Sequence, residues 1–331
     1  MSFLAAFIYR QFIHEPPAPT ASFKGRTVIV TGSNSGLGRE ACRMIVRLGA
    51  SRVILACRNV DKGKIAAKDI QATTSCSPDM LEVWHLDMSS YASVLAFAKK
   101  VNADLPRLDV LLANAGMVTR KFRMTEDNEE SITTHVVSLS LLAFLVLPKL
   151  RETAMKFNTQ THFTATASEL YEVAKFKERK VPDGKIFATL NDKSKANMED
   201  RYNVSKLLLM LVIRQVATMF PLDSCQIIMN CVAPGFCHSE LGMNEINGPI
   251  LNRVVQIVKN ILCRPTEVGA RTLVYGASAG ANTHGQYLPD CKITPMKGLA
   301  KGKEGMELQN RVWMELKEKL EQIRPGVTSP S

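Results

Sequence analysis

A tyrosine and a lysine stand four residues apart, at Tyr202 and Lys206, just before an apolar run over 207–213. Residues at this spacing share one face of a helix, and the apolar run predicts that the helix is buried. A phenol has an ordinary pKa near 10, which a neighbouring ammonium lowers by stabilising the phenolate. A lowering of roughly 3 units, worth about 4 kcal/mol, brings the phenol into the range of acid–base catalysis. The pair is therefore a candidate proton donor and acceptor, although a core tyrosine beside a solvated lysine has the same spacing.

The elements that must position this pair can be read from the alternation of the chain. Strand-like segments lie at 27–31, 52–56, 81–85, 108–113, 161–166, 226–231 and 287–288, and helix-like segments at 37–48, 61–73, 91–101, 129–151 and about 303–323. Pro148 is expected to kink or end the fourth of these helices. The alternation predicts an α/β fold: a single Rossmann-type doubly wound domain. We expect its seven-stranded, mainly parallel sheet to have the order 3-2-1-4-5-6-7, with helices on both faces. The polar stretch of more than 30 residues before Tyr202 is expected to be functional or locally folded.

Composition limits the function classes. With 331 residues and 46% hydrophobic content, the chain can bury one large core. Its net charge of +11 is spread without a Lys/Arg block, so we interpret it as a contribution to solubility with some attraction for anionic cofactors, and not as a sign of nucleic-acid binding. The eight cysteines lack metal-type spacing, which indicates reduced thiols in a cytoplasmic protein without a bound metal.

Residues 1–22 form an N-terminal extension to the domain at 23–331. Its apolar residues are too few to span a bilayer, and they fall on one helical face: Phe3, Leu4, Phe7, Ile8 and Phe12. A Pro-rich break follows at 16–19. We expect this face to pack on the domain, and the alternative is a weak membrane-surface contact or a dimer contact.

A glycine-rich segment at 31–38 follows the first strand and opens a helix. Such a turn lets the backbone approach a pyrophosphate at the helix N-terminus. The predicted cofactor residues of this loop are Gly32, Ser33, Asn34, Ser35, Gly36, Leu37 and Gly38. Its glycine spacing is a variant of the dinucleotide fingerprint. Arg58, at the end of the second strand, stands where an acid selects NAD, so the sequence favours NADP(H).

Several motifs occur in the order of one family. They are Thr-Gly-Ser-Asn-Ser-Gly-Leu-Gly at 31–38, Leu-Asp at 86–87, Asn-Ala-Gly at 114–116, Ser168, Tyr-Asn-Val-Ser-Lys at 202–206 and Pro-Gly at 234–235. From about Lys24 to Lys292 the chain resembles the short-chain dehydrogenase/reductase superfamily. Leu-Ala-Cys-Arg-Asn at 55–59 is similar to the retinol-dehydrogenase-like branch found among fungal secondary-metabolism reductases.

The resemblance implies roles for individual residues. Tyr202 is the general acid or base, Lys206 lowers its pKa and binds the nicotinamide ribose, and Ser168 bonds the substrate oxygen. The implied contacts to the rest of the cofactor come from Asp87, Asn114, Ala115, Gly116, Pro234 and Gly235. A substrate lid is implied at about 236–263. Each residue also has a simpler interpretation, Ser168 as a helix cap and Asp87 and Asn114 as turn residues.

One position departs from the family pattern. Where the family places an asparagine that relays protons to the lysine, this chain has His135, with Val137 as the competing alignment. A histidine titrates near neutral pH and is a candidate replacement for the relay, although it is also often a satisfied polar residue. The leading expectation is an NADPH-dependent reductase acting on a ketone or aldehyde of an apolar small molecule, and the fold is compatible with a homo-oligomer. The alternatives are a non-redox isomerase, dehydratase or cyclase on the same fold, and a cofactor-sensing protein.

Overall fold

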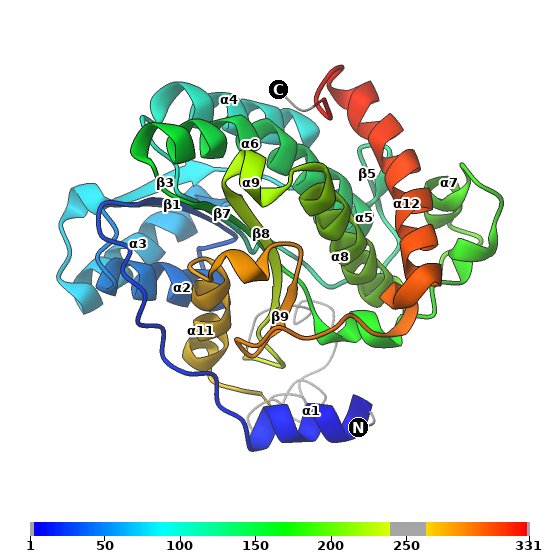
Figure 1. Cartoon of the computed structure of the whole chain (residues 1–331), viewed down its shortest axis with the longest axis horizontal. Coiled ribbons are helices and arrows are strands. Elements are labelled where there is room, and N and C mark those ends of the chain that lie inside the picture. The colour runs from blue at the N-terminus through cyan, green and yellow to red at the C-terminus, as the bar shows by residue number, and fades with distance from the viewer. Residues whose placement is uncertain (1–2, 239–262, 330–331) are drawn as a thin grey trace.

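The structure is a computed structural model that describes residues 3–238 and 263–329. Seven parallel strands form one sheet in the order β3-β2-β1-β4-β7-β8-β9 (Figure 1). The strands are β1 (Thr27–Thr31), β2 (Arg52–Cys57), β3 (Leu81–His85), β4 (Val110–Ala113), β7 (Thr161–Thr166), β8 (Ile227–Ala233) and β9 (Tyr287–Pro289). Counted along the chain this order is 3-2-1-4-5-6-7, which confirms the predicted fold class.

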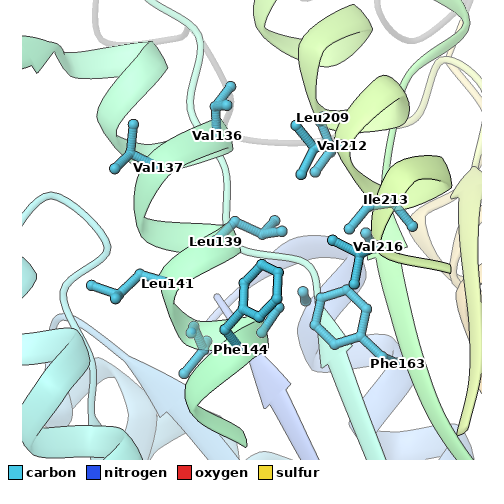
Figure 2. Close-up of a cluster of buried hydrophobic side chains, with 14 of the residues drawn as sticks. Val136, Val137, Leu139, Leu141, Phe144, Phe163, Leu209, Val212, Ile213 and Val216 are labelled. Carbon is cyan, nitrogen blue, oxygen red and sulfur yellow. The ribbon is translucent and has the colours of Figure 1, made fainter. Parts of the chain in front are cut away.

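Helices cover both faces of the sheet. One face carries α2 (Gly36–Arg47), α3 (Val60–Thr74) and α11 (Thr266–Gly276), and the other carries α4 (Tyr91–Asp104), α6 (Ser138–Phe157) and α8 (Arg201–Met219). Side chains of a strand point alternately to the two faces. In β1, Val28 and Val30 accordingly join the core under α2, and Ile29 joins the core under α6 and α8. Figure 2 shows this second core, where Leu139 and Phe144 of α6 face residues of α8.

The helix that leads into α6 is irregular at its start and longer than the sequence predicts. A short α-helical turn, α5 (Glu130–Ile132), continues into a π-helical turn at Thr133–Val137 and then into α6. The helix runs through Pro148 to Phe157, because Leu147 and Leu150 on either side of the proline are buried in the core. By length and composition alone Glu130–Phe157 could cross a membrane, but 89% of its most apolar window is buried inside the protein.

The polar stretch before α8 is locally folded. It contains two 3₁₀ turns, Glu169–Val173 and Lys177–Lys180, and the helix α7 (Ile186–Leu190). The C-terminal helix α12 (Gly302–Ile323) holds it through Glu315, whose carboxylate accepts the backbone N–H groups of Ile186 and Phe187 (3.1 and 2.9 Å). A two-stranded hairpin, β5 (Met124–Thr125) with β6 (Asn128–Glu129), was not predicted.

The N-terminal extension forms the helix α1 (Phe3–Phe12), drawn at the lower edge of Figure 1. Ile8 and Phe12 are 46% and 54% exposed, so in the described part of α1 the predicted apolar face does not pack on the domain. Polar groups dock the helix instead: Gln11 Nε2 donates to the Phe236 carbonyl (2.7 Å), and Arg10 pairs with Glu169 (2.9 Å). The predicted lid at about 236–263 lies almost entirely outside the described residues.

Candidate active site

A cleft with a cavity of about 710 Å³ opens beside the ends of β1, β2 and β4. In doubly wound sheets ligands bind in the crevice outside the carboxyl ends of the strands, where the strand order reverses. Here the order reverses between β1 and β4. The predicted cofactor residues that line the cleft are Gly32, Asn34, Ser35, Gly36, Leu37, Arg58, Asp87, Asn114, Ala115 and Gly116.

The glycine loop is shaped by contacts that a side chain would block. Gly32 and Gly36 have φ of +65° and +55°, a region that favours glycine. A Cβ at Gly38 would lie 2.5 Å from the Gly32 carbonyl oxygen and 2.6 Å from Nδ2 of Asn114. That amide donates to the Thr31 carbonyl oxygen (3.0 Å), so Asn114 ties the end of β4 to the loop. The N-terminus of α2 therefore borders the cleft, as a pyrophosphate site requires.

Two predicted loop residues lie beneath the cleft and not on its wall. Ser33 is fully buried and its hydroxyl donates to the Val30 carbonyl oxygen (2.8 Å), which fixes the loop from below. Gly38 is packed against the backbone of the same loop. These two positions hold the loop in shape without facing the cavity.

The end of β2 and the first turn of α3 bring two cations to the cleft. Arg58 lines the cleft, and so does Lys62 in the first turn of α3. Asn59 caps that helix, with its side-chain oxygen accepting the Lys62 backbone N–H (2.9 Å). Sequence reasoning found Arg58 but missed Lys62. The signal was the cap: an asparagine followed three residues later by a lysine places that lysine on the first helical turn.

Asp87 is both a turn residue and a residue of the cleft wall, so its two predicted roles are compatible. Its Oδ1 accepts hydrogen bonds from the backbone N–H and the hydroxyl of Ser89 (2.9 and 2.7 Å), as a turn residue does. It also lines the cleft after β3, where the resemblance implies a contact to the cofactor.

Lys206 and Tyr202 lie on the first turns of α8, next to Ser168 at the end of β7. Lys206 is 4% exposed, and its Nζ donates to the Thr166 carbonyl oxygen (2.8 Å). Burial lowers the pKa of Lys206 to about 8. A Cβ at Gly116 would lie 3.7 Å from the same Nζ, so the ammonium borders the cleft at that glycine. Thr166 was not among the predicted residues, because it acts through its backbone carbonyl, which any residue type supplies.

The pKa of Tyr202 moves in the direction opposite to the prediction. Burial raises the pKa of the Tyr202 phenol, and a hydrogen bond with Ser168 opposes the rise without cancelling it. The Lys206 ammonium is 5.8 Å from the centre of the ring and is directed at the Thr166 carbonyl. The four-residue spacing was right about proximity but wrong about which of the two effects dominates.

His135 lies in the π-helical turn and is completely buried. Its Nε2 accepts the Met117 backbone N–H (3.0 Å), so the ring proton is on Nδ1, which donates to Ser205 Oγ (2.8 Å). The Ser205 hydroxyl in turn donates to the Tyr202 carbonyl oxygen (2.7 Å). Burial and the Lys206 charge lower the pKa of His135 well below its ordinary range. A relay role would need one of these two hydrogen bonds to open. Val137, the competing alignment, is buried in the core.

The Pro-Gly motif follows β8 and faces the N-terminal helix. Gly235 has φ of +77°, and a Cβ there would lie 2.9 Å from the Arg264 guanidinium. Arg264 is buried, donates to the Pro234 carbonyl oxygen (3.4 Å) and forms an ion pair with Asp290. Among residues 3–238 and 263–329 no group of three or more histidine, cysteine or acidic side chains is arranged to hold a metal ion.

Comparison with known proteins gives a consistent result. A family model described as short chain dehydrogenase matches residues 26–248, more than half of the chain. The short chain dehydrogenase/reductase dmxR8 of Cryptosporiopsis sp. (strain 8999) is 47% identical over 325 residues, which cover 98% of this chain and 99% of that protein. The short-chain dehydrogenase anuD of Penicillium roqueforti (strain FM164) is 38% identical, with 97% and 84% covered.

Solved structures share the fold at low identity. L-sorbose reductase from Gluconobacter frateurii, complexed with NADPH and L-sorbose, has a TM-score of 0.60 at 20% identity and covers 86% of this chain and 100% of that one. An NADH-dependent reductase complexed with NAD has a TM-score of 0.58 at 19% identity, covering 82% and 98%. From its sequence match to the family model and to these relatives, the chain belongs to the short-chain dehydrogenase/reductase family and is an oxidoreductase.

Proposed function

We propose that the chain is an NADPH-dependent reductase of a ketone or aldehyde group on an apolar small molecule, or catalyses the reverse oxidation. The observation that carries the proposal is the grouping of Ser168, Tyr202 and the buried Lys206, whose ammonium is held by the Thr166 carbonyl oxygen at the Gly116 border of the glycine-loop cleft. The fungal relatives support a secondary-metabolite intermediate as the substrate.

Each of the three residues has one task in this proposal. Ser168 donates a hydrogen bond to the carbonyl oxygen and holds it beside the phenol. Bound NADPH supplies the hydride that reduces the carbonyl carbon. Tyr202 gives its hydroxyl proton to the carbonyl oxygen, which completes the alcohol and leaves a phenolate. The Lys206 ammonium stabilises that phenolate, and the Thr166 carbonyl keeps the ammonium in place.

The cleft suits a dinucleotide, and the charges at the end of the cleft beside β2 and α3 favour NADP(H) over NAD(H). The close approach of Gly38 to Gly32 leaves the loop backbone open to a pyrophosphate. Arg58, after β2, and Lys62, in the first turn of α3, both line the cleft, and these two cations support binding of a 2′-phosphate. None of Cys57, Arg58 and Asn59 is an acid that would bond a ribose 2′-hydroxyl.

The test combines cofactor binding with a carbonyl panel. Calorimetry of NADPH against NADH on the purified chain is expected to show tighter binding of NADPH. A panel of apolar ketones and aldehydes is then expected to include substrates that oxidise NADPH. Tight NADPH binding with no oxidation across the panel counts against a reductase, and equal binding of the two cofactors counts against the NADPH preference.

A further inference from the structure

The helix α1 lies across the substrate side of the sheet. Its polar contacts reach segments that directly follow strand ends: Glu169 after β7, Phe236 after β8, and the Arg264–Asp290 pair, of which Asp290 follows β9. The carboxyl ends of these strands are the side on which a doubly wound sheet receives its ligand. In Figure 1 the helix is accordingly separate from the helices that cover the two faces of the sheet.

Charged groups clamp α1 in this place. The Arg264 guanidinium donates to the carbonyl oxygens of Arg10 and His14, the latter at 3.0 Å, while it also pairs with Asp290. The side chains of Arg264 and Asp290 are 4% and 3% exposed, so the clamp is shielded from water. A shielded ion pair resists separation because either charge alone is costly to bury.

A second ion pair connects α1 to the catalytic loop. Arg10 Nη1 lies 2.9 Å from Glu169 Oε1, and the two side chains are 15% and 9% exposed. Glu169 is the residue after Ser168 and opens the 3₁₀ turn that Ser168 caps. Burial raises the pKa of Glu169, and the Arg10 charge opposes the rise. The residue that follows Ser168 is therefore ion-paired with a cation of the N-terminal helix.

We propose that α1 forms a wall of the substrate half of the site and that Arg10 is a positioning residue, which holds Ser168 through Glu169. The inference rests on the proposed reductase function for its readout. It assigns part of the substrate selection to the N-terminal extension, whose helix lies outside the dinucleotide cleft.

The test is a set of point variants assayed with NADPH and a carbonyl substrate. Arg10→Met leaves Glu169 buried without its cation, so we expect kcat/KM for the carbonyl to fall by about 10- to 100-fold, with KM for the carbonyl raised. We expect the affinity for NADPH to stay unchanged, because none of the described residues that line the cleft belongs to α1. Adding Glu169→Gln to Arg10→Met removes the uncompensated charge and restores a large part of the loss, whereas Arg10→Lys keeps activity near wild type.

Glu15→Gln is the matched control. Glu15 pairs with Arg271 at 2.7 Å and also joins the N-terminal segment to the domain, but it is 66% exposed and Arg271 keeps its bonds to Glu267. This variant should keep the wild-type kinetics. If Arg10→Met behaves like Glu15→Gln, or if it weakens NADPH binding as much as it raises KM, the inference is overturned. Should Arg10→Met fail to fold, an unchanged KM in both Arg10→Gln and Glu169→Gln overturns the inference as well. NADPH oxidation by the wild type is measured in the same assay, so a failed reductase proposal is recognised separately.

Discussion

Replacing His135 by leucine tests whether this histidine positions the site or takes part in proton transfer. The ring is fully buried, accepts the Met117 N–H and donates to Ser205. Leucine is of similar size but has no polar atoms, so the Met117 N–H loses its acceptor. Such an orphaned donor costs about 1–3 kcal/mol, and the lost bond to Ser205 adds about 1 kcal/mol. We therefore expect His135→Leu to lower the free energy of unfolding by about 2–4 kcal/mol.

The same change should also slow catalysis. The His135 ring packs edge-on against the Tyr202 ring, with 5.9 Å between their centres, and Ser205 connects it to the Tyr202 backbone. Loosening these contacts lets the phenol move, which we expect to lower kcat by about tenfold. The shape of the pH–rate profile should not change, because a histidine whose pKa is held well below its ordinary range is neutral throughout the assay.

His284→Leu is the matched control, assayed by urea unfolding and by kcat between pH 5 and 9. His284 also accepts a backbone N–H, from Met229 (3.3 Å), and bonds a carbonyl oxygen, of Ala217 (2.9 Å), but it lies toward the other end of α8. It should lower stability and leave kcat near wild type. The reasoning is refuted by a limb near pH 6–7 in the wild-type profile that disappears in His135→Leu, since that limb identifies a proton relay.

Three further predictions concern the cofactor and the fold. Arg58→Ala and Lys62→Ala should each weaken NADPH binding by about 10- to 100-fold and leave NADH binding unchanged, because charge-assisted bonds to a phosphate are worth about 1.5–3 kcal/mol; equal losses for both cofactors contradict this. Burial lowers the pKa of His162 from 6.5 to about 4, so the unfolded chain takes up a proton that the folded one does not. Stability should accordingly be full above pH 6.5 and fall by about 3 kcal/mol toward pH 4, as followed by urea unfolding, and His162→Gln should flatten this slope. Gly38→Ala forces a Cβ to within 2.5 Å of the Gly32 carbonyl oxygen. The variant should have a free energy of unfolding lower by about 1–3 kcal/mol and should bind the dinucleotide more weakly. Calorimetry of the variant that matches the wild type would contradict this, because it would show that the loop adapts to the extra methyl group.

The sheet and the glycine loop were predictable because their signals are local. Each signal is contained within about ten residues of sequence: the apolar pattern of strands such as β1, the glycines at the first turn, and the apolar run after Lys206. The course of α6 through Pro148 was not predictable, since burial of its neighbours in a distant core outweighs the lost backbone hydrogen bond. The raised pKa of Tyr202 was likewise hidden, because desolvation depends on the whole surrounding fold.

Contacts over long sequence distances were the other limit. Arg10 and Glu169 are 159 residues apart in the sequence, and nothing in the sequence around either residue indicates the other. Arg201, one residue before Tyr202, is fully buried between Glu129 and Glu178 at 3.5 and 3.7 Å. Its neighbours in the sequence suggest an ordinary surface charge at the start of a helix. In both cases the fold supplies the partner, and a pattern of residue types cannot.

The most direct test of the assigned chemistry is single-turnover hydride transfer by Tyr202→Phe, with NADPH binding measured on the same preparation. The variant keeps the ring and its contact with His135 but has no proton to give. We predict unchanged NADPH affinity and a hydride-transfer rate lower by about 10²- to 10⁴-fold, the range for loss of a general acid. A rate close to that of the wild type, with NADPH still bound, would contradict the role given to Tyr202 and with it the proposed mechanism.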